Sequence, residues 1–241
     1  MIEQSPRFEE LKVRLPEPAG VITEISAVLG IPEWWPSGSR VAVALAHGAA
    51  GNLDDPLIRD LHERLTLKKF LALRFNFPFG EAGRRSGTDS LEVMERTFRA
   101  ALSLFGRDVA QPPAKLILGG KGAGATVAAH LATTRIRLAG LFFLGFPLHP
   151  QDRKGKVQAE SLYRITAPML FVQGTRDRRC DLDTLRETLR GVGASTRLHV
   201  CEEADHNFQV PKRSTRNEAE IRNEVFTVVY DWLESILGAG A

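Results

Sequence analysis

The sequence predicts an α/β fold: a mostly parallel central sheet with helices on both faces and an antiparallel start at the N-terminus. Three observations lead to this prediction. From residue 40 onward, apolar segments of strand length alternate with segments whose apolar residues recur at helical spacing, which indicates βαβ units. These strand segments are continuous apolar runs, as in strands that are covered on both faces. The N-terminal part instead holds two strand-like segments separated by proline and glycine, which favours an antiparallel pair.

The elements follow one another regularly along the chain. The expected strands are residues 8–18, 20–30, 40–47, 68–77, 114–120, 138–146, 167–174 and 196–202. The expected helices are residues 55–66, 88–105, 123–133, 181–190 and 218–237. We find no internal repeat and no low-complexity linker, so we expect a single domain over residues 1–241.

Composition and charge exclude several classes of function. The formal net charge is +3 and the basic residues are scattered, which does not favour a nucleic-acid partner. No basic and apolar leader is visible at the N-terminus, and no apolar run approaches the ~20 residues that span a bilayer. The two cysteines, Cys180 and Cys201, lie far apart without metal-ligand spacing. We therefore expect a cytoplasmic protein with no membrane contact, no metal and no organic cofactor.

Ligands of such sheets bind beyond the carboxyl ends of the strands, so the loops there are the expected site. The first such loop reads LAHGAAGNLDDP. After His47 and Gly48, the small residues Ala49 and Ala50 could turn backbone N–H groups into the site, as in an oxyanion hole. A tight turn around a packed imidazole explains the same residues equally well.

The second loop, within LILGGKGAGATVAAHL, has the layout of a nucleophile elbow. In the pattern G-x-S-x-G, glycines flank a serine because strand and helix approach closely at the turn. Here Gly120 and Gly124 occupy the flanking positions, but Gly122 stands where the serine belongs. A phosphate-binding loop is less favoured because Lys121 precedes the middle glycine. Dinucleotide binding is also disfavoured, since no acidic residue follows at the end of the next strand.

Two further loops carry a carboxylate and a histidine. Asp177 lies in QGTRDRRC, directly after an apolar strand, and His206 lies in EEADHNFQVPKRS, after the last expected strand. An isolated aspartate or histidine in a loop is commonly a solvated surface group. The order elbow, acid, base is that of α/β-hydrolase triads, which indicates descent from such a triad.

These strings together resemble the α/β-hydrolase superfamily, close to small dienelactone-hydrolase-like proteins grouped with testis-expressed and NSL-complex hydrolase-like proteins. They are LAHGAAGNLDDP, RFNFPFGEAGRR, LGGKGAGA, QGTRDRRC and DHNFQVPKRS, and they extend over most of the domain. The resemblance implies a serine–aspartate–histidine site in which Asp177 is the acid and His206 the base. It also implies an oxyanion hole formed by the N–H of Ala123 with that of Ala49 or Ala50. The nucleophile does not carry over to Gly122.

Without a hydroxyl at residue 122, three interpretations stay open. The protein could be an inactive relative that binds a small ligand or a protein partner. His206 could activate water for slow hydrolysis of an ester or lactone. The serine could also have been replaced deliberately in an ordinary serine hydrolase. Cys180 is a weak candidate for a substitute nucleophile, since a lone cysteine is more often a buried apolar residue.

Four further residues are candidates for substrate binding. Phe79 follows a strand and could form a wall of the site, although phenylalanines there usually pack in the core. Arg84 could bind an anionic ligand group, although a solvated loop is the commoner outcome. His47 and Lys121 are included because they flank the expected oxyanion hole and the elbow. The sequence thus predicts hydrolase ancestry with weak or water-mediated activity at most.

Overall fold

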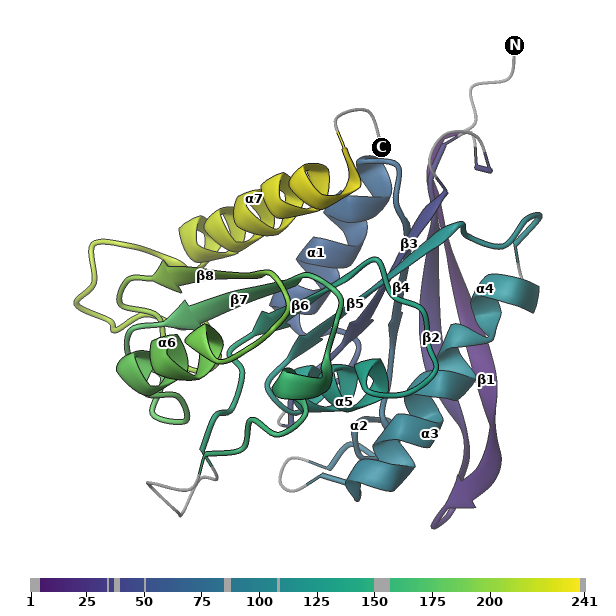
Figure 1. The fold of residues 1–241 in the computed structure, drawn as a ribbon. Helices are drawn as coiled ribbons and strands as arrows, with labels where there is room; N and C mark the ends of the chain where they lie inside the picture. The colour runs from purple at the N-terminus through teal and green to yellow at the C-terminus, as the bar shows by residue number, and fades with distance from the viewer. Residues whose placement is uncertain are drawn as a thin grey trace.

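The computed structural model describes residues 5–33, 35–36, 40–49, 51–84, 88–107, 109–149 and 157–238. Its centre is an eight-stranded sheet in the order β1-β2-β4-β3-β5-β6-β7-β8 (Figure 1). The strands are β1 (Arg7–Ala19), β2 (Ile22–Ile31), β3 (Val41–Ala46), β4 (Leu71–Phe75), β5 (Lys115–Lys121), β6 (Gly140–Leu144), β7 (Met169–Gly174) and β8 (Thr196–Cys201). The β1–β2 and β2–β4 pairs are antiparallel, and all later pairs are parallel. The predicted fold class, including its antiparallel start, is confirmed.

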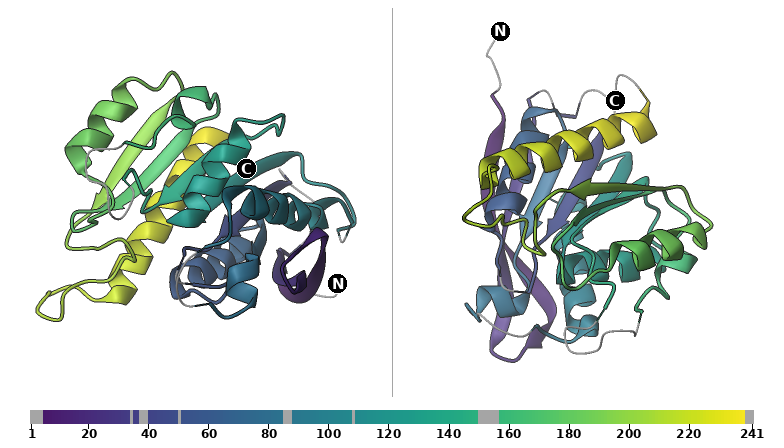
Figure 2. Two further views of the ribbon diagram at one scale, coloured as in Figure 1. Left: turned by 90° about the horizontal axis from the view of Figure 1, so that it is seen from below. Right: turned by 90° about the vertical axis from the view of Figure 1, so that its left-hand side faces the viewer.

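Helices cover both faces of the sheet (Figure 2). On one face lie α1 (Pro56–Leu67) and α7 (Glu218–Leu237). On the other face lie α3 (Leu91–Leu102), α5 (Ala123–Ala132) and α6 (Leu182–Arg190). The short helices are α2 (Pro78–Glu81), α4 (Leu104–Arg107) and the 3-10 turn η1 (Leu162–Arg164). Among the described residues, no helix has the length and apolarity that a membrane span requires.

The central strand β3 shows how the sequence selects the two faces. Its side chains alternate between the two cores, and all of them are buried. The bulkier residues face α1 and α7, whereas the alanines face α3 and α5. The two sets are Val41, Val43 and Leu45, and Ala42, Ala44 and Ala46. The small alanine side leaves room for α5 to lie close above the sheet, where the candidate site begins.

Side-chain caps decide where the helices start. Asp55 caps α1 by accepting hydrogen bonds from two backbone N–H groups, and Asp181 caps α6 by accepting one, from the N–H of Thr184. Ser90 caps α3. Asn217 and Glu220 form a reciprocal capping box at the start of α7. Asp55 and Asp181, expected as the first residues of their helices, are therefore the N-caps, and each helix begins one residue later.

Two expectations about residues 68–105 need correction. The single helix expected over 88–105 is two helices, α3 and α4, because the chain breaks at Ser103, whose hydroxyl donates to the carbonyl of Ala100 at 2.7 Å. The strand expected over 68–77 is limited to β4. Beyond it the chain turns into the short helix α2, which Pro78 starts at a position where proline is well tolerated.

Candidate active site

The turn between β5 and α5 keeps the geometry of a nucleophile elbow. Gly122 sits at its apex with φ +52° and ψ −115°, a conformation that side-chain-bearing residues rarely adopt. A Cβ at Gly120 would come within 2.3 Å of the Gly124 carbonyl carbon, and one at Gly124 within 2.5 Å of the Ala46 carbonyl oxygen. The flanking glycines are thus required by close packing. The N–H of Gly122 donates to the Leu144 carbonyl at 2.9 Å, which holds the apex against β6.

Asp177 and His206 meet beside this apex. His206 Nδ1 lies 2.8 Å from Asp177 Oδ2. The Asp177 side chain is fully buried, and that of His206 is 19% exposed. Because a carboxylate only accepts hydrogen bonds, Nδ1 carries a proton, and in the neutral ring Nε2 is then the nitrogen with the lone pair. Nε2 lies 3.1 Å from the position that a Cβ on Gly122 would occupy. The structure therefore brings Asp177, His206 and the turn at Gly122 together.

The acid is held by neighbours that sequence reasoning missed. The buried Gln173, at the end of β7, donates from Nε2 to Asp177 Oδ2 at 2.5 Å and accepts the N–H of Phe146 at 3.0 Å. The N–H of Arg179 donates to Asp177 Oδ1 at 2.8 Å. With both oxygens engaged, the carboxylate is fixed in orientation toward His206. A glutamine inside the apolar run APMLFVQG was the available signal, because a buried amide must find partners.

The loop that carries the base is also tied down. The side chain of Asp205 accepts two backbone N–H groups from the residues that follow His206. The N–H of Arg176 donates to the carbonyl of Ala204 at 2.9 Å, which joins the base loop to the acid loop. These bonds fix His206 without engaging its Nε2. The side chain of Arg179 does approach that atom, with Nη1 at 3.5 Å, the outer limit of a hydrogen bond.

Backbone N–H groups near the apex fit an oxyanion hole. Ala123 is the first residue of α5, where N–H groups point outward along the helix axis and favour negative charge. Gly48 lies against the apex, its Cα 3.8 Å from a Cβ built on Gly122, and Ala49 follows it in the loop after β3. The other expected donor, Ala50, lies outside the described residues. The loop of Gly48 and Ala49 and the helix of Ala123 thus flank the apex.

Comparison with known proteins agrees with this architecture. The family model described as "Alpha/beta hydrolase domain" matches residues 39–234. The chain belongs to this family. It is also similar to the structure of a dienelactone hydrolase from Anabaena variabilis, at 18% identity and a TM-score of 0.72, over 96% of this chain and 99% of that one.

Two further solved structures extend the likeness to other hydrolases. The dienelactone hydrolase-like promiscuous phosphotriesterase P91, from metagenomic libraries, is 18% identical, with a TM-score of 0.69 over 96% of this chain and 99% of that one. An esterase from Pyrococcus furiosus is 14% identical, with a TM-score of 0.72 over 97% and 94%. At these identities the likeness shows a shared fold.

His47 has a structural role in this α/β hydrolase, and its expected place in substrate binding needs correction. The ring is fully buried. Its Nε2 accepts the N–H of Phe77 at 3.0 Å, so Nδ1 carries the proton and donates to the Gly48 carbonyl at 2.9 Å. Burial lowers the pKa of His47 to about 4, which keeps the ring neutral. The alternative of a tight turn around a packed imidazole describes this residue.

Two other expected substrate contacts, Phe79 and Arg84, are engaged by neighbours within the protein. Phe79 is fully buried, stacked on Phe77 with centroids 5.8 Å apart, so it belongs to the core. Arg84 pairs with Asp89 through a side chain that is 46% exposed.

Lys121 is buried in an ion pair rather than offered to a ligand. Its Nζ lies 2.5 Å from Asp55 Oδ2, and both side chains are at most 10% exposed. The pair joins the end of β5 to the N-cap of α1. Both residues line a cavity of about 250 Å³ next to the elbow, together with Gly48 and Asn207.

Cys180 does not replace the missing nucleophile. Its side chain is buried, and burial together with the nearby carboxylate of Asp177 raises its pKa to about 12. The thiol therefore stays protonated at neutral pH, whereas thiolate is the reactive form.

Proposed function

We propose that this chain is a degenerate hydrolase: it keeps the acid–base pair of a serine esterase but hydrolyses esters or lactones only slowly, through water. The observation that carries the proposal is the position of His206 Nε2, 3.1 Å from the place of a Cβ on Gly122, above an apex with elbow backbone angles and no hydroxyl. In this proposal His206 is the base and Asp177 its acid, and the covalent route is closed because glycine has no atom to attack a carbonyl.

The proposed reaction uses His206 as a general base toward water. Water gives a proton to Nε2 while its oxygen attacks the substrate carbonyl. The N–H of Ala123 stabilises the negative charge on the carbonyl oxygen, and Asp177 stabilises the imidazolium that forms. His206 then returns the proton to the leaving alkoxide, which yields a carboxylic acid and an alcohol. Sites without their nucleophile retain about 10³–10⁴-fold acceleration over water, which sets the expected scale.

The substrate class follows from the related structures. Their names include a dienelactone hydrolase, esterases and a promiscuous phosphotriesterase, all of which act on ester-type bonds. We extend this class to the present chain and place it in the dienelactone-hydrolase-like branch with testis-expressed and NSL-complex hydrolase-like proteins. In this proposal Gly122 replaces an ancestral serine. Activated carboxylic esters and strained lactones suit a weak nucleophile such as water best.

A second candidate function, ligand binding without turnover, is favoured by Arg179. Its guanidinium lies 3.5 Å from His206 Nε2. A cation at this point attracts an anion, such as a carboxylate, to the base and competes with water for the Nε2 lone pair. A small carboxylate held between Arg179 and the start of α5 would then be a ligand rather than a product.

The test compares the chain with Gly122→Ser and Gly122→Ala on p-nitrophenyl esters and a lactone. Both variants place a Cβ at the same tight position, so their difference isolates the hydroxyl. We expect the serine variant to be at least about 10²-fold more active than the alanine variant, with a burst of acyl-enzyme. We expect the unaltered chain to turn over slowly without a burst, at a rate that His206→Ala lowers.

Two outcomes would contradict the proposal. If the unaltered chain and His206→Ala hydrolyse the esters at the same rate, His206 activates no water. If Gly122→Ser is no faster than Gly122→Ala although both fold, the acid–base pair is not aligned for catalysis. Calorimetric titration with acetate or butyrate, repeated with Arg179→Gln, then tests the binding function.

A further inference from the structure

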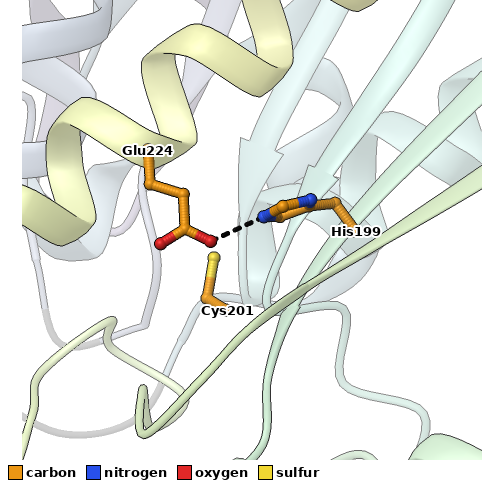
Figure 3. A group of neighbouring side chains, drawn as sticks. All are labelled: His199, Cys201 and Glu224. Atoms are coloured by element: carbon orange, nitrogen blue, oxygen red, sulfur yellow. Dashed lines mark hydrogen bonds and ion pairs between the residues drawn. The ribbon is translucent and has the colours of Figure 1, made fainter.

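A second cluster of chemically distinctive side chains lies away from the elbow, between the edge strand and the last helix (Figure 3). His199 and Cys201 come from β8, two residues apart, so both point to the same face of the sheet. Glu224 reaches them from α7 on that face. One ligand atom of each residue lies within 4.8 Å of those of the other two, and His199 Nε2 is 2.7 Å from Glu224 Oε1.

The three donor atoms match the preferences of zinc. Imidazole nitrogen, thiolate sulfur and carboxylate oxygen are its three common protein ligands. Burial and the nearby Glu224 raise the pKa of the Cys201 thiol, so the thiol is protonated without the ion and must release its proton when the metal binds. Around a tetrahedral Zn²⁺, nitrogen and oxygen ligands lie about 3.3 Å apart, given bond lengths near 2.0–2.1 Å. His199 Nε2 and Glu224 Oε1, now 2.7 Å apart, would have to separate by about 0.6 Å to admit the ion. Cys201 is fully buried, whereas the side chains of His199 and Glu224 are 30% and 23% exposed, which leaves a path for the ion and a water.

Neighbouring residues already orient the carboxylate. Arg216 Nη2 pairs with Glu224 Oε2, the oxygen that does not face His199. Arg216 in turn donates from Nη1 to the Glu202 carbonyl at 3.2 Å, and its N–H donates to Ser214 Oγ at 3.0 Å. Hydrogen bonds of this kind set the orientation of metal ligands. The charge of Arg216 also offsets part of the negative charge of the ligands, so we expect weaker binding than in closed cysteine-rich sites.

We propose that His199, Cys201 and Glu224 form a zinc-binding site, with water as the fourth ligand. The site joins β8 to α7, and through Arg216 it reaches the segment 202–217, which carries His206. Bound zinc would therefore clamp the base loop from outside the active site. The inference depends on the geometry of these three residues and not on the proposed hydrolysis.

Cobalt titration of the full chain tests the site directly. Co²⁺ takes the same tetrahedral ligands as Zn²⁺, and a thiolate ligand adds a charge-transfer band in the near ultraviolet. We expect this band and visible d–d bands to appear on titration and to vanish when Zn²⁺ is added. Cys180→Ser is the matched control, because it removes the other buried free cysteine and should leave the band unchanged.

Variants of the ligands decide the outcome. Cys201→Ser should abolish the charge-transfer band. Loss of an orienting neighbour commonly weakens metal binding 10- to 100-fold, so we expect His199→Gln, a direct ligand, to weaken Co²⁺ binding at least about 100-fold. His199 is partly exposed, so this variant stays informative if Cys201→Ser does not fold. The proposal is overturned if the unaltered chain gives no band, if the band is lost in Cys180→Ser, or if affinity is unchanged in His199→Gln.

Discussion

His47 and His206 are two histidines in strand-end loops on either side of the same elbow, yet they are built for different work. Both ring nitrogens of His47 are engaged by backbone groups, the N–H of Phe77 and the carbonyl of Gly48, and the ring is fully buried. Only Nδ1 of His206 is engaged by a carboxylate, and its Nε2 faces Gly122.

The difference shows what separates a structural histidine from a base. A buried imidazole with two backbone partners cannot exchange its proton without breaking the loop around it. An imidazole with one carboxylate partner keeps a lone pair in reach of a substrate, and the carboxylate stabilises the charge it gains. The residue type is the same, and the partners decide its role. This comparison predicts opposite outcomes when each histidine is replaced.

The largest effect is expected at His206, once a nucleophile is present. In the Gly122→Ser background, His206→Ala should lower kcat/KM by about 10³-fold or more, because the serine then loses its base. The melting temperature should change little, since the side chain is partly exposed. Steady-state kinetics and thermal unfolding on the same samples measure both quantities. A double variant that keeps its activity would remove the distinction between the two histidines.

Replacing His47 should instead affect stability. His47→Ala leaves the Phe77 N–H without its acceptor and opens a cavity between two phenylalanine rings, so we expect a loss of about 2–4 kcal/mol in the free energy of unfolding. Urea unfolding measures it. His130→Ala is the control, because that side chain is 43% exposed and its loss should cost under about 0.5 kcal/mol. If His47→Ala lowers the free energy of unfolding no more than the control does, His47 does not contribute to stability in the way we expect.

For each buried histidine taken alone, a smaller effect is expected from pH. Burial lowers the pKa of His47 to about 4, and burial with the nearby Arg74 guanidinium lowers that of His62 to about 3. Both values lie below the pKa of 6.5 of an unfolded histidine. At a pH between the folded and the unfolded pKa, the unfolded chain binds more protons than the folded protein. Stability therefore falls as the pH drops from about 6.5 toward 4. Between pH 7 and 5 each ring should cost roughly 2 kcal/mol.

Urea unfolding at pH 7, 6 and 5 measures this slope. In His47→Ala the decline should be shallower, with His62 responsible for what remains. The pKa of Glu81 is lowered to about 2, although burial opposes the shift. The stability that Glu81 contributes is therefore lost only as the pH falls below its ordinary value of 4.5. A stability that does not change between pH 7 and 5 would contradict the burial of both rings.

The sequence predicted those features that depend on local pattern and chain order. Continuous apolar runs located the parallel strands, and the glycines at 120 and 124 located the elbow because close packing forbids other residues there. The order of Asp177 and His206 after the elbow indicated that these two side chains meet, and the structure shows them in contact. Each of these signals comes from a short stretch of chain or from the order of such stretches.

Contacts between distant residues could not be predicted from pattern. The role of His47 depends on Phe77, thirty residues further along the chain, and was open between two alternatives. The His199, Cys201 and Glu224 cluster arises only because α7 packs across β8. No spacing rule links two residues of one strand, His199 and Cys201, to Glu224 in a later helix. The partners of buried polar groups are set by how the helices and strands pack. Packing depends on many residues along the chain at once, so no short stretch predicts it.

The retained bend at Gly122 has a consequence for the history of the gene. Elbow angles, flanking glycines and the imidazole of His206 surround an apex that carries no side chain. Some glycine codons become serine codons through a single base change, so one point mutation could place a serine at this apex. A serine gained in this way would stand beside Asp177 and His206, which are already in contact with each other.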